Sequence, residues 1–217
     1  INFESGAFIY PNRTGLPFNS YNSITVYGQL LGNGNNNLFG AYNKNHASNL
    51  TLQTSNNTVI FKAGSKVYNV HVYGAKIDNT ALDRDAIYAY ANSNTVIIEK
   101  GSDYTGNCYV VGGYALSRIH ATASDNKIII GSGSFTSEII AGWTTTQSSS
   151  QKATMSDNEV YLYGDADVSE ADIYGAIRTG DADSGTTVMT GNTLIFGYNN
   201  SPWAPANYTM GSVNNFS

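Results

Sequence analysis

One short pattern recurs six times in this chain and constrains its fold more than any other feature: an Asn followed by alternating apolar residues. The spacings between successive Asn residues are 35, 37, 32, 32 and 34. A period of this length is typical of repeat architectures, in which each unit buries its apolar face against the next. The six copies are Asn22-Ser-Ile-Thr-Val26, Asn57-Thr-Val-Ile-Phe61, Asn94-Thr-Val-Ile-Ile98, Asn126-Lys-Ile-Ile-Ile130, Asn158-Glu-Val-Tyr-Leu162 and Asn192-Thr-Leu-Ile-Phe196.

A second pattern follows in the first five repeats: an apolar pair and then two small residues. The first small residue comes 18, 17, 18, 15 and 17 positions after the Asn. The two patterns mark two strands per repeat, and the remaining residues have room for a loop and a third strand, as at Ala86–Tyr90 or Ser48–Leu52. The five copies are Leu38-Phe39-Gly40-Ala41, Val72-Tyr73-Gly74-Ala75, Val110-Val111-Gly112-Gly113, Ile139-Ile140-Ala141-Gly142 and Ile173-Tyr174-Gly175-Ala176.

Alternation within the first pattern predicts one inward apolar face, on which equivalent residues of successive repeats stack about 4.8 Å apart. Each buried aliphatic side chain contributes roughly 1.5–3 kcal/mol, so a stack is stable where a single repeat is not. The low charged fraction of 12%, with 22 Gly and 16 Tyr, also disfavours helices. We therefore predict an all-β fold, a right-handed parallel β-helix (β-solenoid) of about six turns from repeats of 32–37 residues.

The same patterns divide the chain into three parts. Residues 1–21 are expected to form an N-terminal lead-in or cap. The solenoid repeats occupy 22–197, with turns starting near 22, 57, 94, 126, 158 and 192. Residues 198–217 are expected to start a further, truncated turn.

The leading Asn of each repeat is expected at a corner, where its amide bonds local backbone and left-handed geometry is tolerated. Stacked asparagines are also expected to hydrogen-bond along the column. The small pair is expected to mark a tight corner, where a Cβ would clash or where φ is positive. The predicted ladder consists of Asn22, Asn57, Asn94, Asn126, Asn158 and Asn192.

Two sets of outward residues are candidate binding surfaces. Outward positions of the first strand form an apolar stripe that includes Ile97, Ile129 and Tyr161, which either loops cover or a partner, including a second copy, contacts. Tyr42, Tyr114 and Trp143 follow the small pair at one repeat position. They are expected to form an aromatic column, which either stacks on sugar rings or another protein or serves as outer packing.

Catalytic and cofactor motifs are missing from the sequence. There is no nucleophile elbow, phosphate-binding loop or dinucleotide fingerprint, and the three histidines are not at metal-ligand spacings. Cys108 is the single cysteine and is expected to be a buried apolar residue. A net charge of −5 without a basic cluster disfavours nucleic acid as a partner. We expect no cofactor, no metal and no enzymatic activity, although calcium binding by the acidic loops stays open.

Two carboxylates keep a catalytic alternative open. Asp125 and Asp157 each precede the Asn of their repeat, so stacking is expected to bring them to about 5 Å, a separation that retaining glycosidases use. Two positions further on, Lys127 and Glu159 are expected to stack as an opposite-charge pair. The alternative to a noncatalytic protein is therefore a glycan-active β-helix enzyme, similar to a polysaccharide lyase or glycoside hydrolase.

The repeated combination of an Asn-Thr-Val-Ile-Ile pattern with a Val-Tyr-Gly-Ala pattern resembles the β-helical passenger region of bacterial type V autotransporter surface proteins. The resemblance extends from about Asn22 to Ser217, and Gly211-Ser-Val-Asn-Asn-Phe-Ser217 resembles the segment that opens the last passenger rung in some of these proteins. It implies export through the outer membrane, a location at the bacterial cell surface or in the secreted fraction, and a membrane anchor only C-terminal to this chain.

The resemblance implies a function in adhesion or host interaction. The expected partner is a glycan or protein on a host or bacterial surface, and self-association is a further possibility. A purely structural stalk is the third alternative. The family motifs identify no functional residue in this chain.

Overall fold

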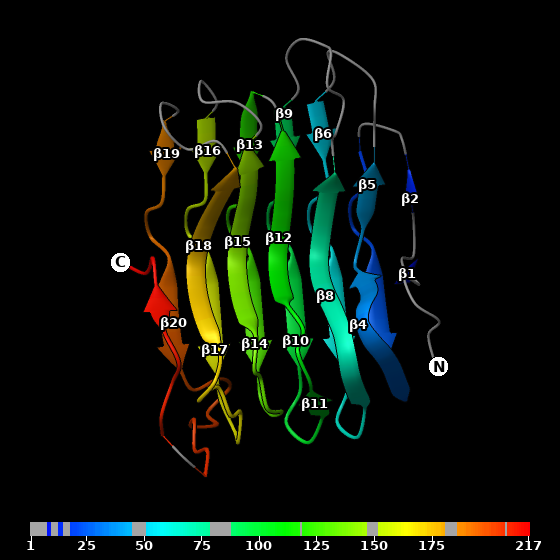
Figure 1. Ribbon diagram of the computed structural model, residues 1–217, viewed down its shortest axis with the longest axis vertical. Coiled ribbons are helices and arrows are strands. Elements are labelled where there is room, and N and C mark those ends of the chain that lie inside the picture. Colours follow the sequence, from blue (N-terminus) through cyan, green and yellow to red (C-terminus); the bar gives the residue numbers. More distant parts are fainter. Residues whose placement is uncertain are drawn as a thin grey trace.

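The computed structural model describes residues 8–9, 13–14, 18–44, 51–78, 88–117, 119–146, 152–180, 186–206 and 208–217. All regular elements in these ranges are β-strands, and they form three sheets in which the named strands pair in parallel. Figure 1 shows the long strands side by side, with the N-terminal end of the stack on the right and the C-terminal end on the left.

The first pattern of each repeat forms one strand of a six-stranded sheet. Each strand begins directly after the leading Asn, and the pairing joins equivalent residues, as in Val59 with Val96 and Val96 with Ile128. The strands are β3 (Ser23–Val26), β7 (Thr58–Phe61), β10 (Thr95–Ile98), β14 (Lys127–Ile130), β17 (Glu159–Leu162) and β20 (Thr193–Phe196).

The second pattern lies in the long strands of a ten-stranded sheet. Its members are β1 (Phe8–Ile9), β2 (Arg13–Thr14), β4 (Gln29–Phe39), β5 (Tyr42–Lys44), β8 (Lys66–Asp78), β11 (Asp103–Thr105), β12 (Val110–Ser117), β15 (Glu138–Thr146), β18 (Asp172–Gly180) and β21 (Val213–Asn214). The predicted third strand forms a five-stranded sheet of β6 (Thr51–Gln53), β9 (Tyr88–Tyr90), β13 (His120–Thr122), β16 (Lys152–Thr154) and β19 (Thr187–Val188).

One solenoid turn passes through the six-stranded, the ten-stranded and the five-stranded sheet in that order. The all-β parallel β-solenoid is therefore confirmed. Fewer than six turns are complete, because the last repeat contributes β20 and β21 but no described strand to the five-stranded sheet.

Both ends of the chain contribute to the stack. The expected lead-in contains β1 and β2, which extend the ten-stranded sheet by pairing with β4 and β5. The sequence favoured residues 198–217 as the start of a further turn. Instead, this segment continues the turn that β20 begins, because β21 pairs with β18 at the position expected for that turn.

The inward apolar face is the core of the molecule. Its side chains are fully buried in the four middle repeats, as the prediction requires, from Val59 to Leu162. The first and last repeats are less covered: Ile24 and Val26 are partly buried, and Phe196 is 52% exposed. Burial therefore depends on having a turn on both sides, as in other stacked repeats.

The six predicted asparagines form a hydrogen-bonded ladder along the column. The Nδ2 of Asn94 donates to Oδ1 of Asn126 at 3.1 Å, and the backbone N–H of Asn94 donates to the same oxygen at 3.0 Å. The other neighbouring pairs are linked in the same way, with Nδ2–Oδ1 distances of 2.9–3.2 Å. Asn57 to Asn192 are at most 1% exposed, so this ladder satisfies polar groups that would otherwise be costly to bury.

The left-handed corner lies one residue earlier than predicted. The asparagines of the ladder do not have positive φ; the residue before each of them does, with φ between 57° and 69°. These six residues are Tyr21, Asn56, Ser93, Asp125, Asp157 and Gly191. The reversal at the preceding residue directs each Asn side chain into the interior, where it meets the Asn of the next turn.

The small pairs do not form a left-handed turn, but the predicted clash is present. A Cβ on Gly112 would lie 2.5 Å from the carbonyl oxygen of Ala141 and 2.9 Å from Cβ of Asn126. A Cβ on Gly113 would lie 2.7 Å from the amide atoms of Asn126. The small pairs are therefore required because the long strands pass directly over the Asn ladder.

Candidate functional site

The first small residue of each pair changes which side chains face outward. Strand pairing skips it: Val111 pairs with Tyr73 and Gly113 with Ala75, whereas Gly112 and Gly74 have no pairing partner. This extra residue breaks the alternation, so the residues on either side of each small pair both face outward and contact each other. In β12, for example, Val110 belongs to the interior core, whereas Val111 and Tyr114 belong to a separate outer cluster.

We call this outer cluster the outer seam. It has two columns, one on each side of the small pairs, and each turn contributes one residue to each column. The first column is Phe39, Tyr73, Val111, Ile140 and Tyr174, and the second is Tyr42, Lys76, Tyr114, Trp143 and Ile177.

Aromatic contacts link the seam residues, both between the two columns and within the second column. The rings of Phe39 and Tyr42 are stacked, with centroids 4.8 Å apart. Trp143 packs edge-on against Tyr114 at 5.0 Å, and its indole Nε1 donates to the hydroxyl of Thr179 at 3.0 Å. These contacts fix the ring orientations before any ligand is bound.

The predicted aromatic column is only partly continuous. Lys76 pairs with both Tyr42 and Tyr114, so a cation separates these two rings. Tyr114 is also only 9% exposed, and its hydroxyl donates to Thr145 at 3.1 Å. The half-buried Tyr42 and Trp143 therefore offer more accessible ring surface than Tyr114 does.

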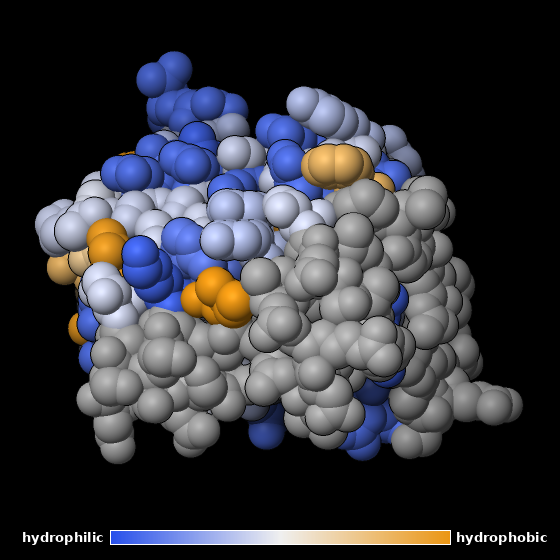
Figure 2. All heavy atoms as spheres, turned by 90° about the horizontal axis from the view of Figure 1, so that it is seen from above, coloured by the Kyte–Doolittle hydropathy of each residue, from blue (hydrophilic) through white to orange (hydrophobic). Residues whose placement is uncertain are grey.

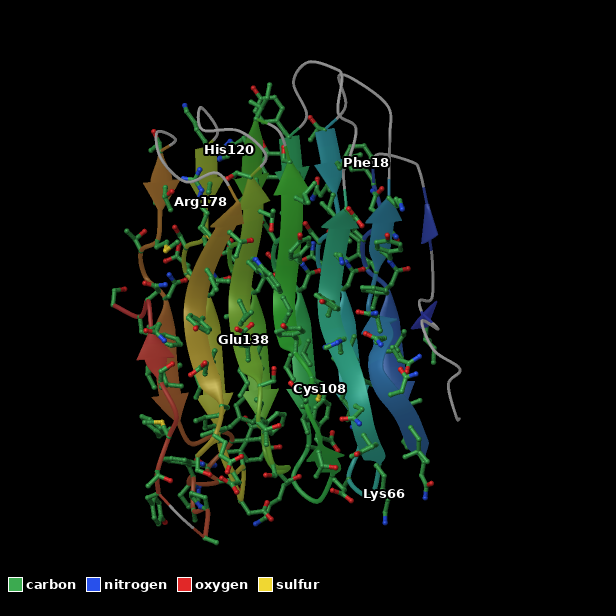
Figure 3. The ribbon with its side chains drawn as sticks, in the orientation of Figure 1. Phe18, Lys66, Cys108, His120, Glu138 and Arg178 are labelled. Carbon is green, nitrogen blue, oxygen red and sulfur yellow. The ribbon has the colours of Figure 1, made fainter. Side chains whose placement is uncertain are left out.

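The cation in the seam is held over aromatic rings. The Nζ of Lys76 lies 5.3 Å from the ring centroid of Tyr73 and 5.0 Å from that of Tyr114. Burial lowers the pKa of Lys76, and the nearby Asp78 opposes this shift. Burial likewise raises the pKa of Glu138, and the charge of Asp172 adds to the effect; Figure 3 labels Glu138 midway along the long strands.

The predicted apolar stripe lies on the outer side of the six-stranded sheet in register, but it is less exposed than expected. Ile97, Ile129 and Tyr161 are paired neighbours, and Ile129 is only 2% exposed. Ile97 lines a hollow of about 380 Å³ and Tyr161 a hollow of about 600 Å³. Both hollows include Tyr198, whose ring contacts Tyr161 at 5.5 Å. Close side-chain packing between turns therefore covers the middle of the stripe.

A polar pocket of about 470 Å³ lies on the ten-stranded sheet, between β4, β8 and the segment that joins β11 to β12. The sequence patterns did not predict it. It is lined by Asn33, Gly34, Asn35, Asn69, His71, Asn107 and Tyr109. We call it the amide pocket. The only sequence signal for it is the spacing from the Asn to the small pair, which is 18 in the two repeats forming its walls and 17 in the repeat between them.

The candidate catalytic carboxylates stand on the outer corner of the solenoid. Asp125 and Asp157 are both exposed and occupy the left-handed position of neighbouring turns. Burial and, second, the charge of Asp157 raise the pKa of Asp125. The predicted ion pair beside them is confirmed, with Nζ of Lys127 2.7 Å from Oε2 of Glu159.

Cys108 is buried in the interior core, as predicted, and burial raises its pKa to about 11, so the thiol is protonated at neutral pH. It is labelled in Figure 3. Within the described ranges, no group of three or more His, Cys, Asp and Glu side chains is arranged to hold a metal ion. Three residues of the sequence predictions lie outside the described residues: His46, one of the three histidines, and Asp181 and Asp183 of the acidic loops for which calcium binding stayed open.

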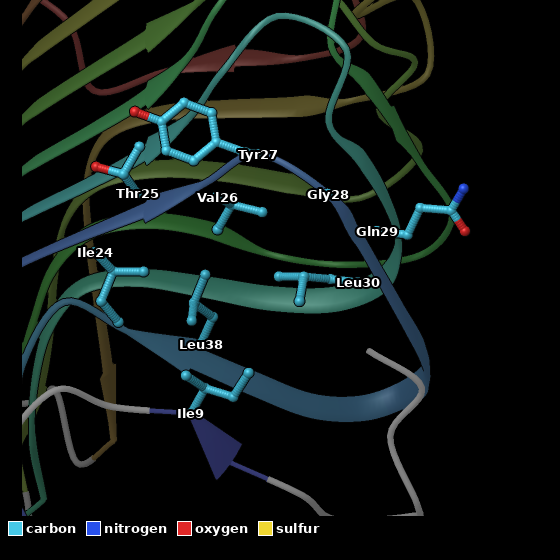
Figure 4. A pocket seen from close by; sticks show the side chains of 9 residues that line it. All are labelled: Ile9, Ile24, Thr25, Val26, Tyr27, Gly28, Gln29, Leu30 and Leu38. Carbon is cyan, nitrogen blue, oxygen red and sulfur yellow. The ribbon is translucent and has the colours of Figure 1, made fainter.

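The N-terminal end of the stack has an apolar hollow of about 310 Å³. Figure 4 shows Ile24, Val26 and Leu30 turned toward one another, with Leu38 and Ile9 below them. Tyr27 and Gln29 point away from this hollow. It is the exposed edge of the interior core, next to the strand β3 that ends the six-stranded sheet.

No family model, no curated protein and no solved structure matches this chain. The described residues include no helix with the length and hydrophobicity that a membrane span requires.

Proposed function

We propose that this chain is a noncatalytic passenger fragment of the autotransporter kind, displayed on the bacterial surface or secreted, and that it binds a glycan or protein of a host or bacterial surface. The observation that carries this proposal is the outer seam. Aromatic residues of several turns gather in its two columns, where Tyr42, Trp143 and Tyr174 keep part of their surface exposed, although the packing of the solenoid interior does not require them.

The seam has the properties of a pre-organised binding surface. Trp and Tyr side chains dominate binding energy at interfaces because they combine a large contact area with few rotatable bonds. The ring of Trp143 is already fixed by Tyr114 and Thr179, so little conformational entropy is lost when a ligand packs on it. Both a sugar ring and an apolar protein side chain fit such a surface.

The repeat motifs and the parallel solenoid support the passenger assignment and the surface location. A stalk made of stacked turns presents the same register of outward residues over its whole length. On the face that Figure 2 shows, seen from above relative to Figure 1, the apolar residues among those coloured are separated from one another by polar residues. Self-association between copies through the stripe of Ile97 and Tyr161 remains part of the proposal and predicts dimers in solution.

Adhesion can be tested with beads that carry the purified chain. We expect these beads to retain host or bacterial cells, and Trp143→Ala to reduce retention at least tenfold. Tyr88→Ala is a matched control, since Tyr88 is an exposed tyrosine on the five-stranded sheet. Retention no higher than on uncoated beads, across a panel of cell types, would contradict the proposal.

The noncatalytic part of the proposal has its own test. The chain is incubated with a panel of polysaccharides, and reducing ends and unsaturated uronates are measured. We expect neither product. Products that disappear in Asp157→Ala would establish the glycan-active enzyme instead.

A further inference from the structure

The amide pocket exists because the pairing of β8 with its two neighbouring strands is interrupted near Asn69 on both sides. β4 pairs with β8 up to Leu31 with Tyr68 and resumes at Asn36 with Val70, so four residues of β4 face Asn69 alone. On the other side, the pairing of β11 with β8 ends at Thr105, and that of β12 begins at Val110. Bulges of this kind redirect side chains and are frequent at functional sites.

The two bulges form walls, and the strand between them forms the floor. Asn33 and Asn35 come from the first wall, and Asn107 and Tyr109 come from the second. Asn69 lies on the floor with a left-handed backbone, φ 52°, and its Oδ1 accepts the backbone N–H of Asn107 at 3.1 Å.

His71 ties both walls to the floor. Its Nε2 lies 2.6 Å from the carbonyl oxygen of Gly34, and its Nδ1 lies 2.9 Å from the backbone nitrogen of Tyr109. A carbonyl only accepts and a backbone N–H only donates, so His71 is the neutral tautomer with its proton on Nε2. Burial lowers the pKa of His71, which favours the same neutral form.

The lining therefore offers amides, the neutral imidazole of His71, the ring of Tyr109 and no charge. Asn35 and Asn107 are exposed, and the hydrogen bonds found near them involve their backbone atoms. Each amide presents both donors and an acceptor, which matches a hydroxyl group that donates and accepts at once. The side chain of Tyr109 stacks on His71 at 4.8 Å and contacts Trp143 at 6.0 Å, which connects the pocket to the outer seam.

We propose that the amide pocket binds one uncharged sugar residue of a glycan whose neighbouring residues lie along the outer seam. This inference rests on the proposed adhesive function and narrows its partner to a glycan. A sulfate, a phosphate or a carboxylate fits the lining poorly, because no residue lining the pocket is cationic and can form a charge-assisted hydrogen bond with it. A pocket with a few placed polar groups beside an aromatic ring is typical of small-ligand sites.

The test compares glycan binding by the intact chain and its variants, on an array of neutral, sialylated, sulfated and uronate-containing glycans. We expect neutral glycans to bind. Tyr109→Ala and the double variant Asn35→Ala/Asn107→Ala are expected to lower affinity at least tenfold while the melting temperature stays close to that of the unmodified chain.

Tyr88→Ala is the matched control for Tyr109→Ala. Tyr88 also contacts a histidine and a second aromatic residue, with His120 at 6.2 Å and Tyr90 at 6.4 Å, but on another sheet. We expect this variant to bind as the unmodified chain does. If Tyr109→Ala unfolds the protein, the double variant still decides the question, because both of its side chains are exposed.

Three outcomes overturn the inference without removing the proposed function. Binding that is lost in Trp143→Ala but unchanged in both pocket variants would restrict the site to the seam. Binding confined to anionic glycans would exclude the uncharged ligand. If the beads still retain cells after periodate has oxidised the cell-surface sugars, the partner is a protein.

Discussion

The Asn ladder and the outer seam are both columns built by the same repeats, yet they differ in composition. The ladder has the same residue in every turn, and Asn57 to Asn192 are at most 1% exposed. The second column of the seam contains Tyr42, Lys76, Tyr114, Trp143 and Ile177 at an equally regular register. The comparison separates what the fold requires from what the fold permits.

The physical reason is the number of hydrogen-bond donors and acceptors in neighbouring turns that the side chain at each position must pair with. A ladder Asn accepts two hydrogen bonds from the preceding turn and donates to the next, in a space bounded by the small pair. An amide supplies both roles without charge, with the acceptor and the donor on separate atoms that face opposite neighbours along the column. A seam residue needs only to pack on its neighbours, so its identity is free to serve binding.

The largest expected effect is at the centre of the ladder. Asn126→Ala removes the Oδ1 that accepts from the backbone N–H and Nδ2 of Asn94, and it removes one of the two donors to Oδ1 of Asn158, so we expect a loss of about 3–5 kcal/mol in the free energy of unfolding. Urea denaturation measures it. Asn22→Ala is the control, because Asn22 ends the ladder and is only half-buried. Equal losses in both variants would contradict a cooperative ladder.

The second effect concerns the space above the ladder. Gly112→Ala places a Cβ 2.5 Å from the carbonyl oxygen of Ala141, so we expect a destabilisation of about 1–3 kcal/mol from overpacking. Gly28→Ala meets nothing within 4 Å and is expected to be neutral. Thermal unfolding of both variants makes the comparison. A neutral Gly112→Ala would mean that the small pairs are not required by close packing.

The third effect sharpens the contrast with the seam. Trp143→Ala removes a half-buried ring and the hydrogen bond to Thr179, so we expect a loss of only about 1–2 kcal/mol. Binding of the ligand is expected to weaken at least tenfold. A variant that loses stability as much as Asn126→Ala, or that keeps full binding in an affinity measurement, would remove the distinction between the two columns.

The smallest effect is a pH dependence of the amide pocket. Because the pKa of His71 is lowered below 6.5 in the folded state, its contribution to stability is present above about pH 6.5 and is lost as the pH falls toward the folded-state value. The urea midpoint is expected to fall more between pH 7.5 and pH 5.5 in the unmodified chain than in His71→Gln. Identical changes in both proteins would show that His71 does not contribute.

The sequence predicted the interior well because the interior repeats. The alternation in Val59–Phe61 and its five equivalents identified the inward face, and the shared Asn identified the column. The corner was placed one residue late, because the residue before each Asn differs between repeats, although five of the six are Asn, Ser, Asp or Gly, which favour turns. The ends were also less certain, since residues 198–217 continue a turn without repeating its second pattern.

The candidate site was less predictable because it depends on departures from the repeat. The position of Tyr42 and Trp143 could be read from the spacing, but not that Lys76 separates Tyr42 from Tyr114 in the pairing or that Tyr114 is covered. The amide pocket combines residues of three turns whose pairing is interrupted, and the repeat pattern signals this only as a one-residue difference in spacing.

The sequence by itself determined that the chain stacks equivalent strands into a parallel solenoid, because short segments with strand alternation recur about every 34 residues and bury their similar apolar faces by stacking. Only the tertiary structure decided which outward side chains remain accessible. Accessibility depends on contacts between neighbouring turns, such as those that cover Ile129 and leave Trp143 half-buried, and these contacts are set by side-chain volumes and bulges in other repeats.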